Sequence, residues 1–368
     1  MTCIDADVHP LTQSGMKDLL PHVKDPGWRR RLEIYSGFGV GRRPTPIGGA
    51  GNIGANYAGD TIPPNGGRPG ADPQFMVEQL LNGHEVAHAI LTPLEALFVG
   101  RLTNIDDMLH LMPAVNDYFI ETWLPVDERF KLSIGVQAHD PAGGAEEIRR
   151  LADHPQVVAV MLPFIDRLMG HRHYYPIYEA AAEAGLAIVV HPGMGEGEFQ
   201  GQGTYAVAPP ANYTQIQAML PPLAIANMIS LVFDGVFQRY PTLKVSFTEW
   251  GCTWAAPIMW RMDDRWRALR IESPWLDEPP SRYVRRHIRF TTQPLEDPEQ
   301  PEHLLQILEM MHAEETVLFS SDYPHWDNEF PDFTLKGLPD SLQRRIRYEN
   351  ALDTFSRLKM PVPAGEAG

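Results

Sequence analysis

The chain has 368 residues, of which 43% are apolar and 21% are charged, and its formal net charge is −16. This composition is typical of a globular protein, and the length fits either two average domains or one large α/β barrel. The negative charge argues against a nucleic-acid or anionic-membrane partner, because both are themselves anionic. An anionic substrate therefore has to be attracted by local arginines or by a bound metal ion.

The two cysteines, Cys3 and Cys252, show no CxxC spacing, which predicts free thiols in a reducing compartment. The first residues carry two aspartates and no basic, apolar leader, so no secretory signal is expected. The most apolar long segment, 216–237, is interrupted by prolines and polar residues and is predicted to be a buried helix, not a membrane span. A cytoplasmic protein is expected.

Short runs of β-branched and aliphatic residues recur along the chain, each ending in polar, proline or glycine residues. Continuous apolar runs of this length are typical of strands buried on both faces. Eight are found, at residues 2–10, 88–94, 131–141, 157–163, 187–193, 244–251, 288–294 and 316–325.

Between these runs lie segments in which apolar residues recur three and four positions apart, as in amphipathic helices. The first is expected to begin at Pro113, since proline suits the first helical position. Eight strands alternating with helices predict an α/β protein with a (β/α)8 TIM barrel as a single domain over 1–368, with an open doubly wound sheet as the alternative. The helical segments are 113–125, 143–155, 174–186, 224–241, 253–269 and 302–314.

Residues 37–72 depart from this alternation and hold eleven glycines and five prolines. They include a GxGxxG at 49–54, but no apolar strand precedes it and no helical pattern follows, so a dinucleotide site is not indicated. A long connection after the first strand predicts a loop insertion over the barrel mouth, with a surface excursion as the alternative. Arg42 within it is a candidate for binding a substrate carboxylate, or is a solvated loop charge.

Chemistry-bearing residues collect at the carboxyl ends of the predicted strands, where barrels place functional groups. Asp7 and His9 alternate at the tip of the first strand, His191 follows the fifth, Glu249 the sixth and Asp322 the eighth. A buried acidic strand tip is costly unless a cation compensates it. Two imidazoles with carboxylates suit one divalent metal ion, zinc or manganese.

The stretches DADVHP, IVVHPG, FTEWGCTW, LFSSDYPHWD and YENALDTF resemble the amidohydrolase-related group of the amidohydrolase superfamily, whose best-known branch contains aminocarboxymuconate-semialdehyde decarboxylase. The resemblance implies a distorted (β/α)8 barrel with one metal ion at its mouth. It implies the metal ligands Asp7, His9, His191 and Asp322. A carboxylate at position 7 resembles the decarboxylases of aromatic acids. Together with the apolar C-terminal helix, the resemblance also favours a homodimer.

The chain departs from that pattern after strand six, where many members carry a catalytic histidine. Here the residue is Glu249, which acts either as a replacement proton carrier or by holding His191 or the metal-bound water. His325, three residues after Asp322, is a candidate proton donor, or else caps its loop. Two substrate contacts are expected. Trp254 lies among aromatic residues that either wall a ring-shaped substrate or simply pack, and Gln293 ends strand seven.

A metal ion beside an aspartate supports two reactions. In decarboxylation, protonated Asp322 delivers a proton to the carbon that loses carbon dioxide. In hydrolysis of an amide, lactone or C–C bond, Asp322 takes a proton from a metal-activated water. We expect a non-oxidative decarboxylase of a small cyclic or aromatic carboxylic acid, with hydrolysis as the first alternative and a non-catalytic, ligand-binding barrel as the second.

Overall fold

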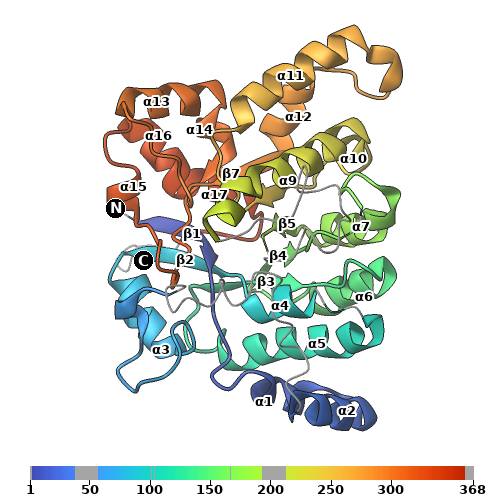
Figure 1. Cartoon of the computed structure of the whole chain (residues 1–368), viewed down its shortest axis with the longest axis vertical. Helices are drawn as coiled ribbons and strands as arrows, with labels where there is room; N and C mark the ends of the chain where they lie inside the picture. The colour runs from blue at the N-terminus through green and yellow to red at the C-terminus, as the bar shows by residue number, and fades with distance from the viewer. Residues whose placement is uncertain are drawn as a thin grey trace, which may run out of the picture.

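The computed structural model describes residues 2–37, 57–100, 102, 104–165, 167–192 and 213–360. Eight parallel strands form one sheet in sequence order, and helices surround it, which confirms the predicted TIM barrel (Figure 1). The strands are β1 (Cys3–Val8), β2 (Val86–Leu91), β3 (Phe130–Gly135), β4 (Val157–Met161), β5 (Ala187–Val190), β6 (Val245–Phe247), β7 (Ile288–Thr291) and β8 (Val317–Leu318).

The barrel closes where the last strand meets the first. β8 is only two residues long, and the chain beyond it continues alongside β1. Val8 forms a parallel bridge with Tyr323, and the Ala6 and His9 amides donate to carbonyls of that segment at 3.0 and 2.8 Å. The residues that close the barrel are therefore the ones that carry the predicted metal ligands of strands one and eight.

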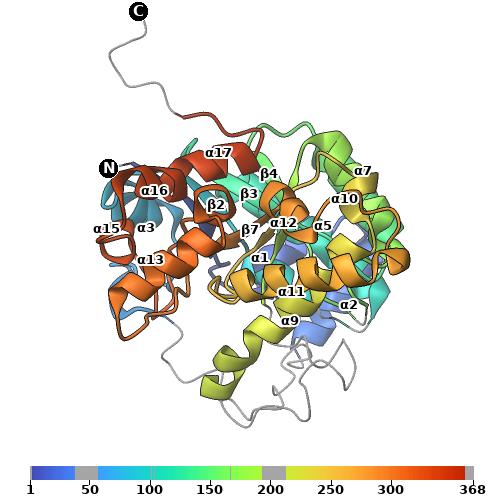
Figure 2. The same ribbon diagram turned by 90° about the horizontal axis from the view of Figure 1, so that it is seen from above.

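The helices cover the outside of the strands (Figures 1 and 2). Those of the first half are α1 (Met16–Leu19), α2 (Pro26–Gly37), α3 (Pro73–Met76), α4 (Leu94–Val99), α5 (Ile105–Thr122), α6 (Pro141–Leu151) and α7 (Tyr175–Ala184). Those of the second half are α9 (Tyr213–Phe233), α10 (Val236–Arg239), α11 (Ala255–Ala268), α12 (Pro280–His287), α13 (Pro301–Met310), α14 (Ala313–Thr316), α15 (Pro331–Thr334), α16 (Asp340–Arg344) and α17 (Asn350–Thr354).

The prediction that a helix begins at Pro113 is wrong. α5 begins eight residues earlier, and Pro113 lies inside it. The start is set by Asn104, whose side chain accepts hydrogen bonds from the amides of Asp106 and Asp107. The N-cap sets where the helix begins, and burial of the apolar face of the helix, with Met112, Val115 and Phe119 fully buried, offsets the cost of the interior proline.

Two other boundaries differ from the expectation. The segment 224–241 is divided between α9 and α10 at Gly235, which has φ +76° and thus the left-handed conformation that ends helices. Several predicted strands are also shorter, because polar strand-end residues leave the ladder: β8 spans two residues of the predicted 316–325.

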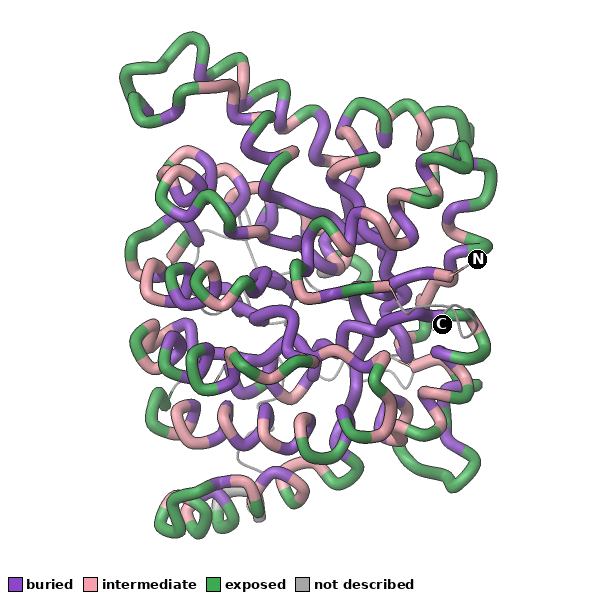
Figure 3. Tube along the Cα trace, turned by 180° about the vertical axis from the view of Figure 1, so that it is seen from behind, coloured by how far each residue is buried: buried purple, intermediate pink, exposed green. Residues whose placement is uncertain are grey.

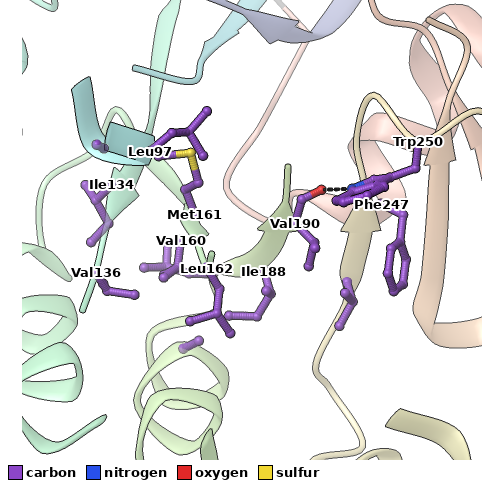
Figure 4. Packing of buried hydrophobic residues seen from close by; sticks show 14 of the residues in the cluster. Leu97, Ile134, Val136, Val160, Met161, Leu162, Ile188, Val190, Phe247 and Trp250 are labelled. Carbon is purple, nitrogen blue, oxygen red and sulfur yellow. Dashed lines mark hydrogen bonds between the residues drawn. The ribbon is translucent and has the colours of Figure 1, made fainter. Parts of the chain in front are cut away.

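The core has two parts. The larger fills the space between strands and helices, and Figure 4 shows part of it around β4, β5 and β6. The smaller contains residues of β1, β2, β4, β5 and β8 together with Phe355 and Leu358. Since β1 and β5 are not neighbours in the sheet, this second cluster lies inside the barrel. Figure 3 shows the strands as an almost continuously buried centre.

The described part of the glycine- and proline-rich segment, 57–72, packs on the loops after β1 and β8. The Ala58 amide donates to the Pro324 carbonyl at 3.0 Å, and the Leu11 amide donates to the Gly70 carbonyl at 2.7 Å. A Cβ on Gly70 would lie 2.7 Å from the His9 carbonyl oxygen, so only glycine fits there. In the described chain, no helix has the length and apolarity needed to cross a membrane.

Candidate metal centre

Four predicted residues from three strand ends meet at one point. Asp7 lies on β1 and His9 directly after it, His191 follows β5, and Glu249 follows β6. Their nearest ligand atoms all lie within 4.8 Å of one another. The Nε2 of His191 is 3.3 Å from Asp7 Oδ2 and 3.0 Å from Glu249 Oε2. This cluster of Asp7, His9, His191 and Glu249 is suitable for one metal ion.

Asp322 lies beside this cluster and forms a second group with His9 and His325. Asp322 Oδ1 is 2.8 Å from His9 Nε2 and accepts a hydrogen bond from His325 Nδ1 at 2.7 Å. The side chain of Asp322 is 1% exposed, whereas that of His325 is 17% exposed. This pair thus connects the buried ligands with the more accessible mouth.

The two cluster imidazoles are oriented by backbone carbonyls. His9 Nδ1 contacts the Thr92 carbonyl at 2.9 Å, and His191 Nδ1 contacts the Pro192 carbonyl at 2.8 Å. A carbonyl accepts only, so each Nδ1 carries the hydrogen and each Nε2 presents its lone pair to the cluster. Thr92 could not be found from the sequence, because a backbone carbonyl leaves no residue-specific signal.

Several buried polar atoms in the cluster have no hydrogen-bond partner. They are Nε2 of both imidazoles, Oδ1 of Asp7 and Oδ2 of Asp322. Leaving such atoms unpaired costs about 1–3 kcal/mol each, so a group that pairs them is expected. A divalent cation bound by imidazole nitrogen and carboxylate oxygen does so, and the residues therefore fit a zinc or manganese ion.

The carboxylates dominate the electrostatics of the cluster. Burial alone lowers the pKa of His191, but Asp7 and Glu249 raise it to about 10. Burial raises the pKa of Asp7, yet the two imidazoles hold it below its usual range. For Glu249, burial and the nearby Asp322 together raise the pKa. A cation entering this negative environment competes with protons for the imidazole nitrogens.

Glu249 and Asp322 are held in the left-handed backbone region, with φ +64° and +61°. Non-glycine residues there store strain of about 1–3 kcal/mol, which the surrounding structure must offset. The Glu249 amide donates to Thr291 Oγ1 at 3.0 Å, and the Asp322 amide donates to the Asp7 carbonyl at 3.2 Å. These bonds turn both carboxylates toward the cluster.

Asp5 supports the cluster from behind. This fully buried carboxylate accepts hydrogen bonds from the Ser321 amide at 2.9 Å and the Asp7 amide at 3.2 Å. It thereby joins the segment that carries Asp322 to the strand that carries Asp7.

The residues predicted to contact the substrate differ in their surroundings. Gln293 is 2% exposed, donates to the Asp327 carbonyl at 3.3 Å and keeps an unpaired Oε1. The indole N–H of Trp254 donates to the Trp250 and Gly251 carbonyls, and its ring packs on Phe290. Arg42 lies outside the described residues.

The aromatic residues grouped with Trp254 do not form one wall. Trp250 is buried and donates to the Val190 carbonyl at 2.9 Å (Figure 4). Tyr323 is buried and donates to Gln79, whereas Trp326 is 54% exposed. The residue that sequence reasoning missed is Tyr57, which pairs with the His325 backbone and stacks on its ring at 5.7 Å. Its only signal was an aromatic residue within the glycine- and proline-rich segment 37–72.

Comparisons with known proteins agree with this architecture. A curated relative is 2-amino-3-carboxymuconate-6-semialdehyde decarboxylase of Dictyostelium discoideum, 25% identical over 190 residues. The match spans about half of each protein, 49% of this chain and 48% of that one.

Two solved structures share the fold along nearly their whole length. The 5-carboxyvanillate decarboxylase of Sphingomonas paucimobilis superposes with a TM-score of 0.67 at 18% identity, covering 96% of this chain and 99% of that one. The same enzyme of Novosphingobium aromaticivorans, complexed with manganese and 4-hydroxy-3-methoxy-5-nitrobenzoic acid, gives 0.63 at 15% identity, covering 96% of each chain. The sequence profile of the family described as amidohydrolase matches residues 4–357, so this chain belongs to the amidohydrolase family.

Proposed function

We propose that the chain is a metal-dependent, non-oxidative decarboxylase of a small cyclic or aromatic carboxylic acid. The observation that carries the proposal is the cluster of Asp7, His9, His191 and Glu249 beside the Asp322–His325 pair. Within it, Nε2 of both imidazoles and Oδ1 of Asp7 are buried without a hydrogen-bond partner. The relatives described above are decarboxylases, and they supply the reaction class. Manganese is the first choice of metal because one solved relative holds it, and zinc is the second.

The cluster at the mouth would hold a divalent ion, whose positive charge would attract an anionic substrate and stabilise developing negative charge. The chain's own residues move the proton. Asp322 and His325 deliver a proton to the ring carbon that bears the carboxylate. The C–C bond then breaks, its electron pair returns to the ring, and carbon dioxide leaves. One proton is consumed for each carbon dioxide released.

The substrate is proposed to lie between this pair and the segment 57–72. Gln293 and Trp254 remain candidates for its contacts, as does Arg42. Tyr57 joins them because its ring stacks on His325 and its side chain is near His9 and Asp322.

Hydrolysis by a metal-activated water is the second candidate function. It is favoured by the presence of a carboxylate, Glu249, at the end of strand six. A carboxylate at this position adds negative charge where an anionic substrate would bind, and it could accept a proton from water. A neutral amide or lactone is less affected by that charge.

One experiment separates the two reactions. Protein loaded with Mn²⁺ is incubated with hydroxybenzoates, pyrimidine carboxylates, lactones and amides while released carbon dioxide and hydrolysis products are measured. Release of carbon dioxide from an aromatic or heteroaromatic acid supports decarboxylation if the release stops when a chelator removes the metal. Hydrolysis of a lactone or amide without carbon dioxide overturns it.

We also propose a cytoplasmic homodimer. Both cysteines are free and buried, which suits a reducing compartment. The C-terminal helix α17 does not supply the interface, because Ala351 and Phe355 pack inside the barrel cluster. The arm formed by α11 and the connection to α12 carries exposed apolar residues instead: Trp260, Leu269, Ile271 and Trp275. Light scattering of the wild type and Ile271→Glu tests this, since a monomeric wild type overturns it.

A further inference from the structure

We propose that Glu95 determines substrate specificity, because its Oε2 accepts a hydrogen bond from a hydroxyl or amino group on the ring of the bound acid. This inference deepens the proposed function and rests on it, since the acid is the one held at the metal centre. Glu95 belongs to neither group of possible metal ligands among the described residues.

Glu95 lies in the connection that supports the metal centre from the side of β2. β2 ends at Leu91, and the carbonyl of the next residue, Thr92, contacts His9 Nδ1 at 2.9 Å. Glu95 follows three residues later, in the first turn of α4. The connection 92–95 therefore both orients a predicted metal ligand and carries the Glu95 carboxylate, at the end of the barrel where functional groups gather.

One oxygen of the Glu95 carboxylate is anchored. Oε1 accepts hydrogen bonds from the Thr12 amide at 2.8 Å and from the Thr12 hydroxyl at 2.6 Å. Thr12 comes three residues after His9, and its carbonyl accepts from Arg68 Nη1 at 2.9 Å. The Glu95 side chain is thereby fixed between the loop after β1 and the segment 57–72, which is where the substrate is proposed to lie.

The other oxygen of this carboxylate is unpaired. Within the described chain, Oε2 is buried and has no hydrogen-bond partner. Burial raises the pKa of Glu95, whereas the hydrogen bonds from Thr12 act in the opposite direction. A buried carboxylate oxygen without a donor is unfavourable. A hydroxyl or amino group of the ligand supplies the donor that Oε2 needs.

Tyr57 connects Glu95 with the reacting groups. Its ring stacks on that of His325, with 5.7 Å between the centroids. Burial raises the pKa of the Tyr57 phenol, nearby cations lower it, and the charges of Glu95 and Asp322 raise it further. The phenol group is thus close to carboxylates on both sides. An aromatic ring bound beside Tyr57 is therefore near Asp322 and Glu95 at the same time.

Binding of matched acids to Mn²⁺-loaded protein tests the inference. The acids are 2,3-, 2,4-, 2,5- and 2,6-dihydroxybenzoate, and each is paired with the 2-hydroxybenzoate that carries fluorine in place of the second hydroxyl. Fluorine removes the donor at one ring position with little change in size. Isothermal titration calorimetry gives the dissociation constants, or kcat/KM replaces them where an acid is turned over, and released carbon dioxide is measured separately.

We expect the wild type to prefer the dihydroxybenzoate at least about 10-fold at one ring position, because a site that accepts a hydrogen bond from a hydroxyl rejects the analogue without it. Glu95→Gln should abolish or reverse this preference. Its amide nitrogen donates where Oε2 accepted, while its amide oxygen still accepts from Thr12.

Thr12→Val is the matched control for a purely structural role of Glu95. It removes the hydroxyl bond to Oε1 but leaves Oε2 untouched, so the preference should stay within about 3-fold of the wild type even where stability falls. Circular dichroism checks the fold of both variants.

Equal binding within all the pairs overturns the inference, and this comparison needs no variant. A folded Glu95→Gln that keeps the preference, or a folded Thr12→Val that loses it, overturns the inference as well. Carbon dioxide release without any preference contradicts the role of Glu95 alone, whereas a preference without carbon dioxide release contradicts the proposed decarboxylation alone. A wild type that binds none of these acids overturns both.

Discussion

Two pairs of buried histidines, at opposite ends of the barrel, have opposite electrostatics. His9 and His191 at the mouth, and His88 and His287 at the other end, all anchor one ring nitrogen on a backbone carbonyl. At the mouth, carboxylates raise the imidazole pKa values. At the far end, burial lowers them, and cationic side chains lower that of His287 further. The carboxylates, and not the anchored imidazoles, therefore mark the metal centre.

The largest expected effect tests the mouth against the far end directly. His191→Ala removes a proposed ligand, so Mn²⁺ affinity should fall by about 100-fold or more, since loss of mere supporting contacts already costs 10–100-fold. Activity should disappear with the metal. His287→Asn, the control at the far end, should retain full metal content by elemental analysis. Equal metal content in both variants would contradict the prediction that His191, and not His287, binds the metal.

A second prediction compares two glycines of the segment 57–72, both with positive φ. Gly70→Ala places a Cβ 2.7 Å from the carbonyl oxygen of His9, whereas Gly66→Ala meets nothing within 4 Å. Gly66→Ala should cost about 1–2 kcal/mol of unfolding free energy from backbone strain alone. Gly70→Ala should cost a further 1–3 kcal/mol or so from the clash and should also weaken Mn²⁺ binding. Urea unfolding measures the stability of the two variants, and Mn²⁺ titration measures their metal affinity. Identical losses in the two variants would show that the segment 57–72 does not position the loop that carries His9.

The last prediction concerns pH and the far end. Burial, helped by Lys244 and neighbouring arginines, lowers the pKa of His287 to about 4, against about 6.5 when unfolded. Between these pH values the unfolded state binds more protons, so this contribution is present above about pH 6.5 and is lost as the pH falls toward 4. It is on the order of 3 kcal/mol.

Urea unfolding of metal-free protein at pH 7 and pH 4.5 measures this loss. His287→Asn should be less stable at pH 7, because its packing on Phe237 is lost, but it should show a flatter dependence on pH. An unchanged pH dependence would assign the acid sensitivity to other groups.

The barrel was predictable because strands buried on both faces leave apolar runs, and all eight runs became strands. The meeting of Asp7, His9, His191 and Glu249 followed from barrel topology alone, which places strand ends at one mouth. Helix boundaries were less predictable where a capping residue such as Asn104 competed with Pro113.

The orientation of the two carboxylates at the mouth could not be predicted from the sequence. The direction of the Glu249 and Asp322 side chains depends on positive φ angles, which cannot be predicted from these residue types. The role of Tyr57 was not predicted because its contact with His325 joins positions far apart in the chain. The residue types and their positions thus predicted which side chains meet at the barrel mouth, but not the direction in which each side chain points.

The closure of the barrel between β1 and the segment after β8 has a consequence for biosynthesis. Asp7 and His9 leave the ribosome well before their backbone partners Asp322 and Tyr323, which are translated some three hundred residues later. Contacts of such long sequence separation form slowly, because a large loop must close first. The growing polypeptide therefore cannot assemble this mouth, or take up an ion there with full affinity, until the segment after β8 has been synthesised.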